Sequence, residues 1–129
     1  MKKWRDLLIV SLAWLFFIIC HLIFTKYFLY WTLWWLDIFM HTFGAGLIIY
    51  TWFFLFKLTV FLRLFSSPLL HPILVLSYLM IGWEVYEYLI GNANINRGNY
   101  ILDTTIDLLV GLSSGLITFW LLKSRTINK

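Results

Sequence analysis

The sequence predicts an all-α membrane protein, a bundle of four transmembrane helices. Of its 129 residues, 62% are hydrophobic and 12% are charged, whereas soluble domains are about half apolar and about a quarter charged. Four apolar runs approach the roughly 20 residues that cross a bilayer as a helix. Eight tryptophans and an aromatic content of 21% suit rings at the two membrane interfaces. We therefore expect one transmembrane domain over 1–129, with the lipid bilayer as its partner.

The first two expected helices cover 7–24 and 38–56. The run 7–24 is long enough to span, and no small-residue cleavage site follows it, so we expect it to be retained as a helix. The segment 27–36 is too short to span and is rich in Tyr and Trp. It is therefore expected to lie at the membrane interface.

The third and fourth expected helices cover 72–90 and 102–122. Pro72 suits a first helical turn, where its missing N–H costs nothing. The stretch 91–99 contains two Gly and four Asn, which is typical of a loop. The stretch 58–70 is apolar but contains Arg and Ser-Ser-Pro, and we expect it to lie on the membrane surface.

The basic residues predict the orientation of the bundle. The net charge of +4 would suggest nucleic acid in a soluble protein, but here the basic residues sort by loop, as cytoplasmic loops of membrane proteins do. We expect both termini in the cytoplasm of a bacterial-type cell membrane and no nucleic-acid partner; the oligomeric state stays open. The cytoplasmic set is Lys2, Lys3, Arg5, Lys57, Arg63, Lys123, Arg125 and Lys129, and the outer set is Lys26 and Arg97.

Polar residues cluster at the predicted outer ends of three helices. Within each pair the residues are three or four apart, so they share a helix face. The helix directions place Asp37, Glu87 and Asp103 in a shallow layer and the remaining residues one turn deeper. We expect a single pocket, open to the extracytoplasmic side, with these residues as candidate catalytic groups: Asp37, His41, Glu84, Glu87, Asp103 and Asp107.

A divalent metal would neutralise such a cluster. Charges inside a membrane are costly, and grouped carboxylates persist only with protons, a cation or basic partners. Oxygen ligands with one imidazole suit Mg, Mn, Fe or Zn. The predicted ligands of one such ion are His41, Glu84 and Asp107. Gly111 and Gly115 permit the close helix approach that this site needs.

Two structural interpretations stay open for the cluster. Asp37 and Asp103 begin helices and so suit capping, but Glu84 and Glu87 are at a C-terminal end, where the helix dipole disfavours them. The whole set could also form a polar network without a ligand.

The histidines and the cysteine outside the cluster have simpler expected roles. His21 is expected to be a packing histidine, with its membership of the site left open. His71 precedes Pro72 and is expected to begin a helix. Cys20, the single cysteine, is expected to fill the core.

Three motifs in order resemble those of known membrane families. Asp37-x-x-x-His41, Glu84-x-x-Glu87 and Asp103-Thr104-x-x-Asp107 resemble the signatures of YjdF-like inner-membrane proteins. The wider VanZ-like group is similar, with an Arg before the last acids. The chain departs from both, because Gly111 stands where VanZ-like chains tend to have Asn and because the chain is shorter than typical YjdF-like proteins. The resemblance implies a bacterial-type membrane protein with an outward-facing polar site. VanZ-like members are linked to glycopeptide resistance.

Three classes of function compete. The first is a metal-dependent enzyme acting on a lipid-linked or cell-envelope substrate, with Arg97 placed to bind a phosphate. The second is an ion, proton or small-solute transporter, because intramembrane carboxylates occur in relays. The third is a structural scaffold for envelope stress or antibiotic resistance. The predicted cytoplasmic halves of the helices contain no acidic or basic residue to continue a pathway, which favours a surface site over a pore.

Overall fold

A computed structural model describes residues 2–58, 70–91 and 100–127, and this part of the chain is a helical bundle. It contains four long helices, α1 (Lys2–Lys26), α3 (Trp35–Leu58), α5 (Leu70–Ile90) and α6 (Tyr100–Ile127), and the short α2 (Leu29–Thr32). Within the described ranges, all four long helices are long and apolar enough to cross a membrane. The predicted fold class is therefore confirmed, although each helix except α5 extends beyond both of its predicted ends.

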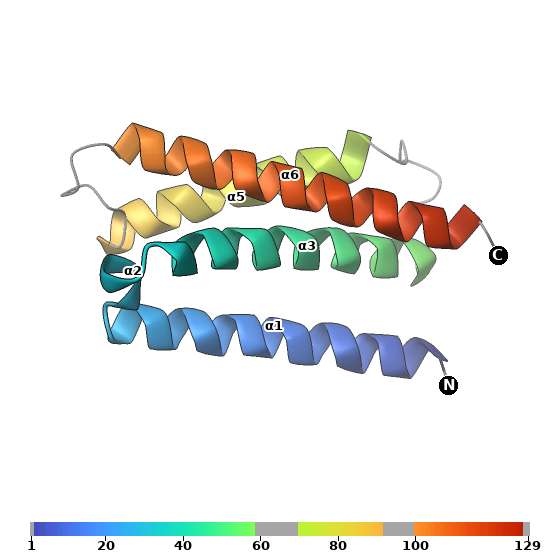
Figure 1. The fold of residues 1–129 in the computed structure, drawn as a ribbon. Helices are drawn as coiled ribbons and strands as arrows, with labels where there is room; N and C mark the ends of the chain where they lie inside the picture. The colour runs from blue at the N-terminus through green and yellow to red at the C-terminus, as the bar shows by residue number, and fades with distance from the viewer. Residues whose placement is uncertain (1, 59–69, 92–99, 128–129) are drawn as a thin grey trace.

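The long helices alternate in direction, so their ends meet in two groups (Figure 1). The N- and C-termini lie at one end of the bundle, and α2 lies at the other, which we call the α2 end. Because α1 and α5 finish at the α2 end while α3 and α6 begin there, residues far apart in sequence are neighbours at that end.

A tight turn separates α1 from α2. Phe28 has a left-handed backbone with a φ of 54°, and its carbonyl accepts a hydrogen bond from the backbone N–H of Trp31 at 3.1 Å. The predicted interfacial segment 27–36 is thus a turn, one short helix and the first residues of α3. Tyr30 on α2 is only 2% exposed, so the segment also contributes to the protein core.

Helix α3 is the centre of the bundle. It packs against α1, α5 and α6, and its closest association is with α6. Within the described residues, the backbone of α1 has Cα atoms within 8 Å only of α2 and α3. α1 therefore contacts α5 through long side chains and not through close backbone packing.

Two glycines of α6 allow the three helices that bear the polar cluster to converge. A Cβ added at Gly111 would overlap the end of the Met80 side chain, and one added at Gly115 would overlap Leu76 Cδ2. Met80 and Leu76 lie one turn apart on α5 and are both buried. The expected close approach at Gly111 and Gly115 is confirmed, and within the chain it serves the contact between α5 and α6.

Gly115→Ala is expected to destabilise the bundle by about 1–3 kcal/mol, the usual range for overpacking a filled core. The new methyl group would meet Leu76, which has no exposed surface and is packed beside Ile49. Thermal unfolding midpoints in one detergent would measure the effect. Gly82→Ala is the matched control, because a Cβ there meets no atom of the protein within 4 Å. Equal midpoints for the two variants would contradict the packing role of Gly115.

Candidate functional site

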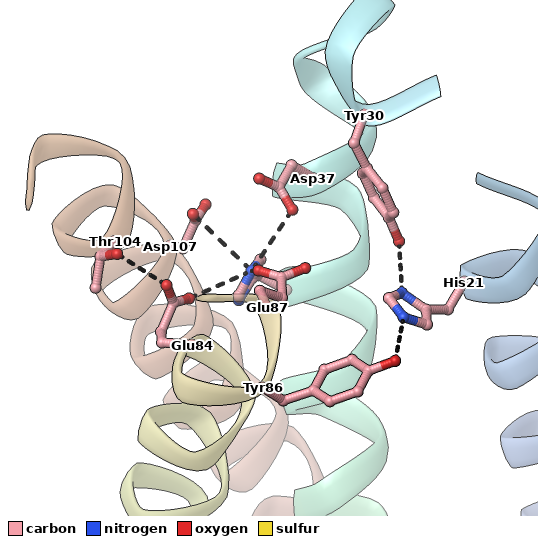
Figure 2. Close-up of polar contacts among 9 residues, drawn as sticks. His21, Tyr30, Asp37, Glu84, Tyr86, Glu87, Thr104 and Asp107 are labelled. Carbon is pink, nitrogen blue, oxygen red and sulfur yellow. Dashed lines mark hydrogen bonds and ion pairs between the residues drawn. The ribbon is translucent and has the colours of Figure 1, made fainter. Parts of the chain in front are cut away.

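The imidazole of His41 lies among four carboxylates, and Figure 2 labels the four acidic residues. Its Nε2 atom is 3.6 Å from Asp37 Oδ1 and 3.6 Å from Glu84 Oε1. The same atom is 3.9 Å from Glu87 Oε2 and 3.9 Å from Asp107 Oδ2. One nitrogen atom therefore faces carboxylate oxygens from α3, α5 and α6.

The helix directions explain this convergence. Asp37 precedes His41 by one turn of α3, and the two are on the same face. Glu84 and Glu87 are three residues apart near the end of α5, and Asp107 lies two turns into α6. The α2 end brings these parts of α3, α5 and α6 to a similar depth.

The two predicted layers are not separate in the structure. His41, which was placed in the deeper layer, lies close both to Glu84 and Asp107 of that layer and to Asp37 and Glu87 of the shallow one. Asp103 lies one turn from Asp107, in the first turn of α6, and is half-buried.

The centre is nearly enclosed by protein. The five side chains are 4–13% exposed, with Asp37 the most exposed. His41 Nε2 and Glu84 Oε1 are buried, and in the described part of the chain neither makes a hydrogen bond. Distances of 3.6–3.9 Å are too long for hydrogen bonds between these groups. A buried polar atom without a hydrogen bond is costly, so this arrangement fits a site that holds a ligand between its side chains.

Thr104 supports the centre from α6. Its hydroxyl donates a hydrogen bond of 2.9 Å to Glu84 Oε2, which leaves Glu84 Oε1 directed at His41. Thr104 is not among the candidate residues predicted from the sequence, although it stands three residues before Asp107 and therefore on the same side of α6. That spacing was the available signal.

The donor atoms are spaced so that they could hold a metal ion. Among the described residues, two sets have ligand atoms within 4.8 Å of one another: Asp37 with His41 and Asp107, and His41 with Glu84 and Glu87. Two ligands at about 2.0–2.2 Å from a tetrahedral ion are about 3.3–3.6 Å apart, close to the distances measured here. The predicted ligands Glu84 and Asp107 fall in different sets, and His41 belongs to both.

His21 lies beside the centre in a separate polar group. Its Nδ1 atom is 3.0 Å from the Tyr30 hydroxyl and its Nε2 atom is 3.4 Å from the Tyr86 hydroxyl (Figure 2). These contacts join α1 to α2 and α5, in agreement with the expected packing role. Burial is the largest reason that the pKa of Tyr30 lies above its usual value, and the nearby charges of Glu87 and Asp37 raise it further. Tyr30 therefore stays neutral.

The remaining predicted residues have the following positions. His71 is the second residue of α5, as expected for a helix start. Cys20 is partly buried against the core formed around Phe17, as expected for a packing residue. Arg97, the predicted phosphate ligand, lies outside the described residues.

No family model matches the chain, and no curated protein or solved structure matches it.

Proposed function

We propose that this chain is a metal-dependent membrane protein of the VanZ/YjdF-like type, acting on a lipid-linked or cell-envelope substrate at the outer leaflet. One divalent ion binds between His41 and the carboxylates of Asp37, Glu84, Glu87 and Asp107. When bound, such an ion would polarise a phosphoryl or ester oxygen and activate water. A carboxylate that is not needed as a ligand is available as a general base.

The observation that carries this proposal is the environment of His41 Nε2. This atom is buried without a hydrogen bond and faces carboxylate oxygens from three helices at 3.6–3.9 Å. A helix-capping role for Asp37 does not account for it, because the imidazole, Glu84 and Glu87 lie outside any cap. A ligand-free network would be expected to close into hydrogen bonds of about 2.7–3.2 Å.

The proposal includes an orientation and a second candidate function. The distribution of basic residues favours both termini in the cytoplasm, which puts the α2 end and the metal site on the extracytoplasmic side. A metal-ion or proton transporter is the second candidate, because buried carboxylates on several helices are also the groups that relays use. The position of the centre near one end of the bundle favours the enzyme.

Elemental analysis of protein purified in mild detergent is expected to find about one divalent ion per chain. Right-side-out vesicles loaded with radioactive Zn²⁺ or Mn²⁺ are then expected to lose the ion to a membrane-impermeant chelator in the external medium. Inside-out vesicles should retain it, because the proposed site then lies near the membrane face that the chelator does not reach.

Metal-free protein that is fully folded and active would refute the metal and favour protonated carboxylates. Stripping from inside-out vesicles alone would refute the orientation, and stripping from both sides would favour the transporter. In an assay of turnover, activity that is lost in Asp107→Asn and retained in Arg97→Ala would remove the phosphate-binding role of Arg97 while sparing the metal.

A further inference from the structure

An apolar cavity of about 240 Å³ lies between α1, α3 and α5, and His41 of the proposed metal site is among the residues that line it. Its wall consists mostly of aromatic and aliphatic residues, and it also includes His41. The residues that define its extent are Trp14 and Phe17 on α1, His41 and Ile48 on α3, and Leu79 and Trp83 on α5.

The cavity opens sideways toward the lipid. In the described structure, no Cα atom of α1 lies within 8 Å of one in α5. Side chains bridge the two helices toward the α2 end, where the ring centroids of Trp83 are 4.7 Å from His21 and 5.6 Å from Phe17. Leu79, one turn farther from the α2 end, lines the cavity and is 44% exposed. Because this exposed surface belongs to a membrane-spanning helix, the mouth of the cavity meets lipid chains and not water.

The cavity runs along the membrane normal, away from the polar centre. The residues of α3 that line it run from Met40 to Ile48, which are eight residues apart and so span about 12 Å of helix at about 1.5 Å per residue. Both lie within the span Trp35–Phe56. The polar centre lies at the α2 end, and the apolar cavity lies farther from that end. A lipid in one leaflet of a bilayer has the same order, with its polar headgroup at the surface and its acyl chains toward the middle.

We propose that this cavity binds one hydrocarbon chain of a bilayer phospholipid, and that the phosphate of the same molecule lies at the metal site. The position of the phosphate rests on the proposed function, whereas the position of the chain does not. A helix of a partner protein is about 10–12 Å wide and does not fit. A polar solute would gain few polar contacts from this mostly apolar wall, whereas apolar cavities bind apolar ligands. A methylene chain would also make the van der Waals contacts that an empty cavity lacks.

The test uses phosphatidylglycerol with a diazirine in one acyl chain, at a low fraction in phosphatidylcholine vesicles that contain the protein. After irradiation, label is expected at Ile48, which is half-buried and lines the cavity, at least as strongly as at Leu55. Leu55 is on the same helix and is 41% exposed, so it reports ordinary contact with surrounding lipid. Label at Leu55 with none at Ile48 in the wild-type protein would overturn the inference, whatever any variant does.

A cavity-filling variant adds a second readout. Leu79→Trp places an indole at the mouth of the cavity and is expected to lower labelling at Ile48 at least fivefold while sparing Leu55. Leu74→Trp is the matched control, because Leu74 is exposed on the same helix and is outside the residues that line the cavity. Equal labelling of Ile48 in both variants would contradict the route through this mouth.

Metal content measured on the same samples separates the two proposals. Label at Ile48 in protein that binds no metal would refute the proposed function and leave the chain site in place. Metal in protein without label at Ile48 would refute the chain site alone.

Discussion

Replacing His41 with alanine is expected to weaken divalent-metal binding by at least about 100-fold. Residues that only support metal ligands usually change affinity by about 10–100-fold, and His41 is placed to act as a ligand itself. It is also the residue common to both candidate ligand sets. The substitution leaves carboxylates of three helices without the nitrogen that they surround. Calorimetric titration of Zn²⁺ or Mn²⁺ into chelator-treated protein would measure the change.

His21→Ala is the matched control for this experiment. His21 is buried to the same extent as His41, but it bonds the hydroxyls of Tyr30 and Tyr86 and not the carboxylates. Both variants remove an imidazole from the bundle, and circular dichroism would verify that each stays helical. Metal affinity should fall only in His41→Ala. An equal loss in both variants would mean that the measured site is not the centre around His41.

The helices were predictable because, in a protein surrounded by lipid, the hydrophobicity of a segment nearly suffices to identify it as a helix. A chain that spans a membrane must satisfy its backbone within helices, so an apolar run of sufficient length specifies an element. The ends were less predictable. α6 continues past Leu122 to Ile127 through basic and polar residues. Their side chains favour water and so end the apolar run, but their backbone groups still form helical hydrogen bonds.

The closeness of five of the six predicted residues was also predictable from the sequence, but their contacts were not. Spacings of three and four residues identify shared faces, and alternating helix directions place Asp37, Glu84 and Asp107 near one another. Which oxygens meet at His41 depends on helix rotation and side-chain reach. The longer side chain of Glu87 reaches the imidazole, although its Cα was assigned to the other layer.

Tyr30 shows what the sequence did not specify. Its segment has neither helical length nor a clear period, and its position depends on the left-handed residue Phe28. A non-glycine residue in that conformation has no reliable sequence signal. The result is a buried tyrosine that bonds His21 in a segment that composition alone assigned to the interface.

Glu84→Gln is expected to change stability in opposite directions with and without metal. In metal-free protein the substitution removes one of the grouped negative charges, so the thermal midpoint should rise. The glutamine retains an oxygen that can accept the hydrogen bond from Thr104, so the effect isolates the charge. In metal-loaded protein the same change removes a proposed ligand. At an ion concentration of about 100 times the dissociation constant, binding stabilises by about 2.7 kcal/mol, and a tenfold to 100-fold weaker site would lose about 1–2 kcal/mol of this.

Thermal unfolding of wild-type protein, Glu84→Gln and Asp6→Asn, each with chelator and with Mn²⁺ or Zn²⁺, would measure both signs. Asp6 pairs with Arg5 at 3.7 Å near the N-terminus, at the opposite end of the bundle, so its neutralisation should leave the metal dependence unchanged. Opposite changes in the thermal midpoint of Glu84→Gln, with and without metal, are expected if the grouped carboxylates share one cation. A ligand-free network predicts that added metal changes the thermal midpoint of none of the three proteins. A midpoint for Glu84→Gln that falls equally in both conditions would show that Glu84 serves packing and hydrogen bonding, and the metal site would have to exclude it.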